Sequence, residues 1–240
     1  STDDNNMTIT ASADGTATGS DVSSVSIAAI SNTDGSLALN FSGDSIVNST
    51  GTDAANSVTV TRSGSGATTI AAIDSTTTLT ATHTGSGAFE ITSFDAEGDV
   101  TIDSSGASGA LTVNSTTFTH NATITGGSGA DSLTMDTAAG SGKVHSVVGG
   151  AGNDTIVGSS GGETSEGGVG ADSITGGAGN DNISGGAGND KLVFVDGDLT
   201  KNDTLDGGDG TDTVNITTAQ AILDSVLTNV ERVDLEFTTG

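Results

Sequence analysis

Polar and hydrophobic residues alternate along this chain in short segments that are separated by turn-forming residues. Before residue 126, the segments centred on Val60, Leu79 and Ile91 alternate apolar residues with polar ones, chiefly Thr. Val, Ile and Thr favour strands, whereas the Gly, Asn, Asp and Ser between the segments favour turns. The pattern therefore predicts many short β-strands.

Part of this pattern has a fixed step. The apolar centres Ile91, Ile102, Val113 and Ile124 are each 11 residues apart. We interpret this step as successive coils of a β-solenoid, because a constant period is typical of stacked repeats. Residues 1–56 also contain strand-like segments but no fixed period, so they either begin the same solenoid or form a preceding β-domain.

A tighter repeat follows, in which 24 of the 37 glycines fall between residues 126 and 210. Its pattern is Gly-Gly-x-Gly-x-Asp-x-apolar-x, and its clear copies begin at residues 126, 149, 167, 176, 185 and 207. Degenerate copies keep the frame at 140, 158 and 198, after a four-residue insert at 194–197 in the last case. A nine-residue period held over this length predicts a second, tighter part of the solenoid.

The end of the chain changes character. Residues Thr218 to Val230 place five apolar side chains at helical spacing, which predicts one short helix that caps the solenoid. A strand is expected over 231–237. The chain thus divides into an N-terminal β segment (1–56), Thr-rich coils (57–125), the glycine-rich repeats (126–215) and a capping helix and strand (216–240).

Charge and composition exclude several functions. The 31 acidic and 5 basic residues give a formal net charge of -26, which excludes nucleic acid because phosphate binding requires clustered Lys and Arg. No segment approaches the roughly 18 consecutive apolar residues of a membrane span. The absence of Cys excludes disulfides and thiol catalysis. No nucleophile–base set or zinc-binding helix is present, so we expect no enzymatic activity.

The nonapeptide has a chemistry of its own. One inward apolar residue per repeat cannot offset ordering costs of roughly 1–2 kcal/mol per residue. Coils stacked about 5 Å apart bring the aspartates at the sixth position together, and these repel unless a cation lies between them. Carboxylates and turn carbonyls are hard oxygen ligands that suit calcium better than magnesium. The sequence therefore predicts a fold that several calcium ions complete.

These residues resemble the RTX, or haemolysin-type, calcium-binding repeat family over about residues 126 to 215. The resemblance implies an all-β fold, a right-handed parallel β-solenoid or β-roll, with calcium bound in the inter-strand loops. Two nonapeptides form one coil in this family, so that successive loops lie at alternate edges. Calcium then lies between loops that are two repeats apart.

The resemblance also implies which residues bind the metal. One edge would carry Asp131, Asp154, Asp172 and Asp190, with Asp212 joining if the insert at 194–197 loops out. The other edge would carry Glu163, Asp181 and Asp203, with His145 in place of an acid. Carbonyl ligands are implied in the glycine-rich turns, at Gly150, Gly152, Gly168, Gly170, Gly177, Gly179, Gly186, Gly188, Gly208 and Gly210. The best sites are expected at the pairs Asp154/Asp172 and Asp172/Asp190, then at Glu163/Asp181 and Asp181/Asp203.

The flanking strands narrow the resemblance to RTX-containing bacterial surface-layer proteins. That likeness implies a secreted, extracellular protein of the bacterial cell surface, exported by type I secretion, which folds when it meets calcium. Besides calcium, the expected partners are other copies of the chain, in a surface lattice, and cell-surface polysaccharide. Two alternatives stay open: an RTX adhesin module that binds a surface or glycan, and the calcium-binding part of a larger secreted protein.

Overall fold

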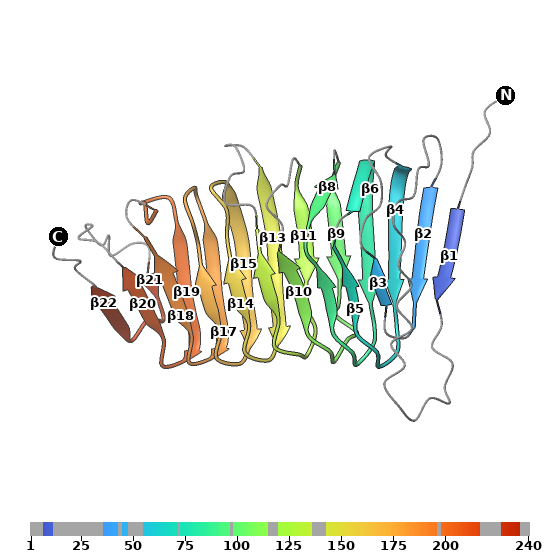
Figure 1. Cartoon of the computed structure of the whole chain (residues 1–240). Coiled ribbons are helices and arrows are strands. Elements are labelled where there is room, and N and C mark those ends of the chain that lie inside the picture. The colour runs from blue at the N-terminus through green and yellow to red at the C-terminus, as the bar shows by residue number, and fades with distance from the viewer. Residues whose placement is uncertain are drawn as a thin grey trace, which may run out of the picture.

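Two parallel β-sheets form a solenoid (Figure 1). The computed structural model describes residues 7–11, 36–42, 45–47, 55–71, 73–96, 98–114, 120–135, 143–195, 198–216 and 227–235. Within these residues the chain passes back and forth between the two sheets, and strands inside each sheet pair in parallel with strands of the coils before and after them. The predicted all-β parallel solenoid is thereby confirmed.

The strands divide into two sets. The 12-stranded sheet, here called sheet 1, contains β1 (Met7–Ala11), β2 (Ser36–Phe41), β4 (Ala55–Arg62), β6 (Ile73–His83), β8 (Phe94–Ala96), β9 (Val100–Asp103), β11 (Ala122–Thr125), β13 (Val144–Ala151), β15 (Gly162–Val169), β17 (Asn182–Gly188), β19 (Thr204–Gly210) and β21 (Leu227–Thr228). The 10-stranded sheet, sheet 2, contains β3 (Ser45–Val47), β5 (Thr68–Ile70), β7 (Phe89–Ile91), β10 (Leu111–Asn114), β12 (Ser132–Thr134), β14 (Thr155–Val157), β16 (Ser173–Thr175), β18 (Lys191–Phe194), β20 (Thr213–Ile216) and β22 (Arg232–Leu235).

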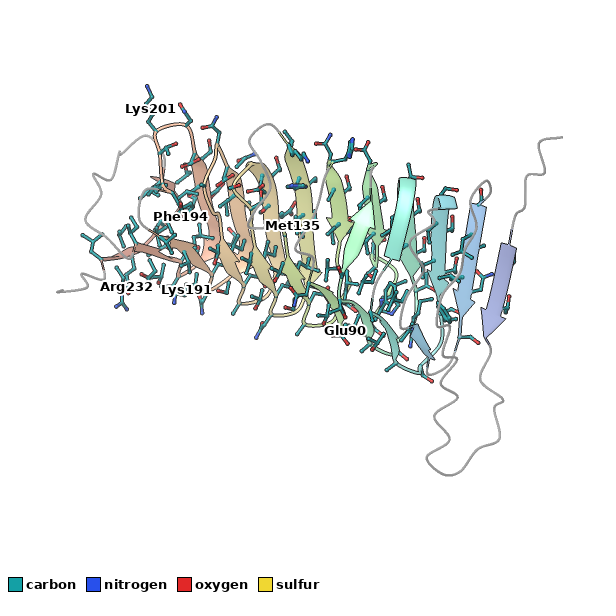
Figure 2. The ribbon with its side chains drawn as sticks, turned by 45° about the horizontal axis from the view of Figure 1, so that its top comes forward. Glu90, Met135, Lys191, Phe194, Lys201 and Arg232 are labelled. Atoms are coloured by element: carbon teal, nitrogen blue, oxygen red, sulfur yellow. The ribbon has the colours of Figure 1, made fainter. Side chains whose placement is uncertain are left out.

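The core is a narrow apolar stack between the two sheets. In β9, Val100 and Ile102 are buried and the residues between and after them are exposed, as alternation along a strand requires. Parallel pairing without a register shift then places equivalent side chains above one another, as with Ile102 and Ile124. Figure 2 shows Met135 and Phe194 among the strands, whereas Lys191 and Arg232 point outward from sheet 2.

The 11-residue step is half a coil rather than a whole one, which corrects the interpretation of the sequence. Ile91 pairs with Val113 in sheet 2, whereas Ile102 pairs with Ile124 in sheet 1. Each step therefore crosses from one sheet to the other, and a coil takes two steps. In the glycine-rich part Ile156 pairs with Ile174, 18 residues on, so two nonapeptides make one coil, as the family resemblance implies.

Both ends of the described chain extend these sheets. Strands β1, β2 and β3 pair in parallel with the strands that follow them, so the described part of residues 1–56 lies within the same two sheets. At the other end, β22 falls within the strand expected over 231–237. None of the described residues forms a helix long and apolar enough to cross a membrane.

The predicted C-terminal helix is wrong where the structure describes it. Residues 217–226 lie outside the described residues, but Leu227 and Thr228 form β21, which pairs in parallel with β19. Leu227 lies beside Leu205 and packs against the core. Leu227 therefore extends a column of inward side chains in sheet 1. The helical spacing of the apolar residues in this segment did not predict this strand.

We predict that Ile183→Asp prevents the repeat region from folding, even at saturating calcium. Ile183 is fully buried between Ser165 and Leu205 of the neighbouring coils, so the substitution buries an unpaired charge at a cost of several kcal/mol. Far-UV circular dichroism would show the loss of β-structure. Asn182→Asp is the control, because it adds the same charge at the exposed neighbouring position; equal spectra for both variants would contradict the inward placement.

Candidate metal sites

A column of five aspartates lies along one edge of the solenoid, which we call the first edge. The members are Asp131, Asp154, Asp172, Asp190 and Asp212, and each is at most 2 % exposed. The backbone N–H of Asp154 donates to Oδ1 of Asp172 at 2.8 Å, and that of Asp172 donates to Oδ1 of Asp190 at 2.8 Å. The same bond joins the other neighbouring pairs. One carboxylate oxygen of each aspartate thus links its coil to the preceding one.

The second carboxylate oxygen distinguishes the members of this column. Oδ2 of Asp154, Asp172, Asp190 and Asp212 is buried and receives no hydrogen bond. By contrast, Oδ2 of Asp131 accepts the backbone N–H of Gly127 at 2.8 Å. A buried carboxylate oxygen without a donor is costly unless a cation or a proton neutralises it. Four of the five aspartates therefore offer an oxygen that no protein group stabilises.

Each of these oxygens faces a space that only glycine leaves open. A Cβ built on Gly167 would lie 2.5 Å from Asp172 Oδ2 and 2.5 Å from the carbonyl oxygen of Gly185 in the next coil. On Gly149 the corresponding distances are 2.5 Å to Asp154 Oδ2 and 2.6 Å to the carbonyl oxygen of Gly167. A carboxylate oxygen and a main-chain carbonyl of the following loop thus converge on one point, as a hard cation requires.

The loops can stack this closely because their other glycines adopt conformations that L-residues avoid. The glycines at the second and fourth positions of five repeats have φ between 88° and 148°. They are Gly150, Gly152, Gly168, Gly170, Gly177, Gly179, Gly186, Gly188, Gly208 and Gly210. A Cβ on any of them would also clash with a main-chain carbonyl of the preceding coil. Six of these ten glycines lie at the ends of the sheet 1 strands β13, β15, β17 and β19, and the other four lie in the loops between strands.

The second edge, which carries His145, Glu163, Asp181 and Asp203, has the same backbone ladder but fewer open oxygens. The backbone N–H of Glu163 donates to Asp181 Oδ1 at 2.9 Å, and that of Asp181 donates to Asp203 Oδ1 at 2.8 Å. Of these three acids, only Asp181 keeps a buried oxygen without a hydrogen bond. Glu163 accepts from the Ser159 hydroxyl and N–H, and Asp203 accepts from the N–H of Thr200. His145 replaces the acid, and its Nδ1 accepts the N–H of Ala122 at 3.1 Å.

Apolar side chains fill the space at Gly176 on the second edge. A Cβ built on Gly176 would meet the Phe194 ring at 2.6 Å and the Ile183 side chain at 2.9 Å, rather than oxygen atoms. Phe194 is fully buried in β18, so the insert at 194–197 does not loop out as a whole. Asp212 nevertheless joins the first edge, because its Oδ1 accepts the N–H of Asp190 at 2.8 Å. The two edges therefore differ in their capacity for a cation, which the repeat pattern alone did not indicate.

Burial raises the pKa values of five edge aspartates: Asp131, Asp154, Asp172, Asp181 and Asp190. Desolvation is the largest cause, and the charges of neighbouring acids raise the pKa values of Asp154, Asp181 and Asp190 further, against hydrogen bonds that lower them. The pKa of Asp154 rises to about 7, that of Asp181 to about 8 and that of Asp190 to about 6. The raised pKa values show that the protein itself stabilises the charged form of these carboxylates poorly.

The ladder continues beyond the last glycine-rich repeat, which the sequence pattern missed. The N–H of Asp212 donates to Glu231 Oε2 at 2.7 Å, and the carbonyl oxygen of Asn229 lies where a Cβ on Gly207 would point. Asn229 has a positive φ of 49°, which Asn tolerates better than most residues. Glu231 thus provides the carboxylate acceptor, and Asn229 the carbonyl oxygen, that a further repeat would provide for Asp212. No Gly-Gly pair lies between Asp212 and Asn229 in the sequence.

No group of three or more His, Cys, Asp or Glu side chains able to hold a metal occurs in the part of the chain that the structure describes. This agrees with the stacked arrangement, in which each candidate site combines a carboxylate with main-chain carbonyls. Such a donor set is composed of oxygen alone and suits calcium rather than zinc.

Comparison with known proteins supports the same chemistry. Curated proteins and solved structures give no match to this chain. A family model does match: the RTX calcium-binding nonapeptide repeat, in four copies, at residues 117–134, 146–161, 157–192 and 199–215. The matched residues include all eight acids at the two edges. The chain thus carries RTX calcium-binding nonapeptide repeats, as the sequence pattern predicted.

Proposed function

We propose that this chain is a calcium-binding structural module of a secreted bacterial protein, in which calcium bound at the first edge completes the fold. The observation that carries the proposal is the buried Oδ2 of Asp154, Asp172, Asp190 and Asp212, each without a hydrogen bond beside an open glycine. When bound, calcium supplies the positive charge that these oxygens lack. Asp181 is the corresponding candidate at the second edge.

The two carboxylate oxygens of each aspartate have different roles in this proposal. Oδ1 of each aspartate fixes the spacing of the coils through the backbone N–H of the preceding coil, and Oδ2 remains available for the metal. The first-position carbonyl of the next loop, such as that of Gly185, contributes the facing oxygen. Because the carboxylates are engaged in this stack, we assign them a structural rather than a catalytic role.

At the level of the whole protein, we assign the module to the bacterial cell surface, in a surface-layer protein. The net charge of -26 supports export in an unfolded state, since self-repulsion opposes collapse until calcium neutralises the loops. The Thr-rich, aromatic-poor coils ahead of the repeats support a structural scaffold rather than a catalytic domain. Contacts between copies, with calcium as a partner in their formation, would build the lattice.

A calcium titration tests the module. We expect far-UV circular dichroism to show a cooperative gain of β-structure as calcium is added to chelator-treated protein, because the stacked carboxylates repel in its absence. Magnesium at equal concentration should have little effect, since it retains its water ligands. An unchanged spectrum between chelator and calcium would refute calcium-driven folding.

Negative-stain microscopy of the calcium samples tests the surface-layer assignment: ordered sheets support it, and monomers that retain a glycan favour an adhesin.

Substitution of one aspartate tests the assigned edge. Asp172→Asn keeps an acceptor for the N–H of Asp154 but replaces the open Oδ2 by an amide N–H₂ group, which cannot bind a cation. We expect fewer calcium ions per chain by isothermal titration calorimetry, with losses at the sites on both sides of Asp172. Asp99→Asn removes the same charge at an exposed position and should leave the number of ions unchanged. Equal stoichiometry in the two variants would disprove the assignment.

The pH dependence of the metal-free protein follows from the raised pKa values. The ordinary value for Asp is near 3.8, and the folded-state values are about 7 for Asp154 and about 6 for Asp190. The folded state therefore binds more protons than the unfolded state between these limits, so the stability is fully present below the ordinary value and is lost as the pH rises through the folded values. In calcium-free buffer, we expect the circular dichroism signal of β-structure to be stronger near pH 4 than at pH 8, because the aspartate-bearing repeats unfold over this range. More β-structure at pH 8 than at pH 4 would contradict this.

A further inference from the structure

The column of inward glycines at the first edge continues upstream as a column of side chains. Arg62 pairs with His83, and the pairing of Thr82 with Asp103 and of Asp103 with Thr125 places Ser104 between His83 and Gly126. Inward positions at the end of successive sheet 1 strands are therefore occupied by Arg62, His83, Ser104, Gly126, Gly149, Gly167, Gly185 and Gly207. The first three side chains are fully buried. The position that is left open beside each aspartate downstream is thus filled upstream.

The Arg62 guanidinium occupies the space between two loops. Its Nη1 donates to the carbonyl oxygen of Gly64 at 2.6 Å. A Cβ on Gly85, in the loop of the next coil, would overlap both Nη1 and that carbonyl oxygen, and one on Gly87 would overlap Nη2 and the carbonyl oxygen of Gly66. A fixed positive charge therefore lies beside the main-chain carbonyls of one loop and against the glycines of the next loop. Downstream, the equivalent space lies between a carboxylate oxygen and a carbonyl of the following loop.

The next coil fills the same space with a neutral pair. Nε2–H of His83 donates to the carbonyl oxygen of Gly87 at 3.0 Å, so Nδ1 accepts the hydroxyl of Ser104 at 3.2 Å. Burial and the nearby positive charge of Arg62 lower the pKa of His83, which agrees with a neutral ring. The ring of Phe89 meets it edge-on with centroids 5.5 Å apart.

Apolar residues also replace the carboxylate in these coils. Phe89 pairs with Leu111 in sheet 2, and the N–H of Leu111 donates to Oδ1 of Asp131 at 2.7 Å. Phe89 and Leu111 therefore extend the aspartate column, and the pair His83 and Phe89 stands where glycine and aspartate stand downstream. No carboxylates are stacked among these residues, so folding there meets no carboxylate repulsion that a metal must offset.

We propose that Arg62 and the His83–Phe89 pair take the place of calcium in the coils of residues 57–114, which therefore fold without metal. These coils present a preformed edge, at β10 and β11, on which the aspartate-bearing coils assemble when calcium binds. The first statement stands independently of the calcium function. The second rests on the proposed calcium-driven folding of the repeats.

Hydrogen–deuterium exchange of the whole chain, followed by mass spectrometry at pH 7.5, tests both statements. In chelator we expect protected amides over 57–114 and rapid exchange over 144–216, with protection of both in calcium. Rapid exchange over 57–114 in chelator that calcium slows would overturn the inference and leave the proposed function intact. Protection of both regions in chelator would instead overturn calcium-driven folding, and with it the second statement.

An arginine substitution tests the role of the guanidinium. In chelator, Arg62→Met should raise exchange in peptides spanning 84–88 by about tenfold or more, because the amides of Ser86 and Gly87 donate to the Gly64 carbonyl that also accepts from the guanidinium. Arg232→Met removes the same charge at an exposed site and should leave these peptides unchanged. The number of bound calcium ions should stay equal in both variants.

Exchange in Arg62→Met equal to that of the unsubstituted chain would overturn the role of the guanidinium. If Arg62→Met does not fold even in calcium, Arg62→Lys decides, because it retains the charge without the planar fork. Retained protection over 84–88 in Arg62→Lys supports a cation that substitutes for calcium. Loss of that protection overturns the proposal.

Discussion

Stacked carboxylates buried at the edge of the solenoid determine the rest of its structure. Each aspartate of the first edge uses Oδ1 to accept the N–H of the aspartate one coil before it, so the carboxylate itself fixes the coil spacing. The same bond forces the second oxygen into a position where no donor reaches it in four of the five coils. The carboxylate that links neighbouring coils through Oδ1 thus also leaves a buried Oδ2 that a cation can stabilise. The spacing of the coils and the affinity for metal consequently have a single origin.

The same edge satisfies its main-chain carbonyls in two ways along its length. Downstream of Gly126, glycine leaves room beside each aspartate, and a bound ion would join carboxylate and carbonyl. Upstream, side chains such as Arg62 and His83 fill that room, and apolar residues such as Phe89 take the place of the carboxylate. At the inward position of the sheet 1 strands, glycine is therefore required downstream because the space must stay open, whereas Arg62, His83 and Ser104 fill this position upstream.

The pattern of residues predicted the strands, the glycine-rich turns and the two edges of the solenoid. Alternation of apolar and polar residues identified strands such as β9, and the nine-residue frame identified the loops with positive-φ glycines. The frame also separated the acids into two edges, since residues 18 apart come to lie on the same face. These inferences hold because they depend only on strand periodicity, on the conformational freedom of glycine and on the constant length of the repeat.

Other features depended on contacts between coils that no single repeat encodes. The 11-residue step proved to be half a coil because the next segment pairs in the opposite sheet. The apolar residue Leu227 joined a strand because Leu205 of the preceding coil provides its partner, although its local spacing favoured a helix.

The sequence alone therefore determined an all-β repeat with oxygen ligands for calcium, because composition and period limit both. Only the tertiary structure decided which acids keep an open oxygen, since that depends on the donors that neighbouring loops supply. Asp131 and Asp172 share one motif, yet Gly127 satisfies the first, whereas the second faces only the carbonyl of the next coil.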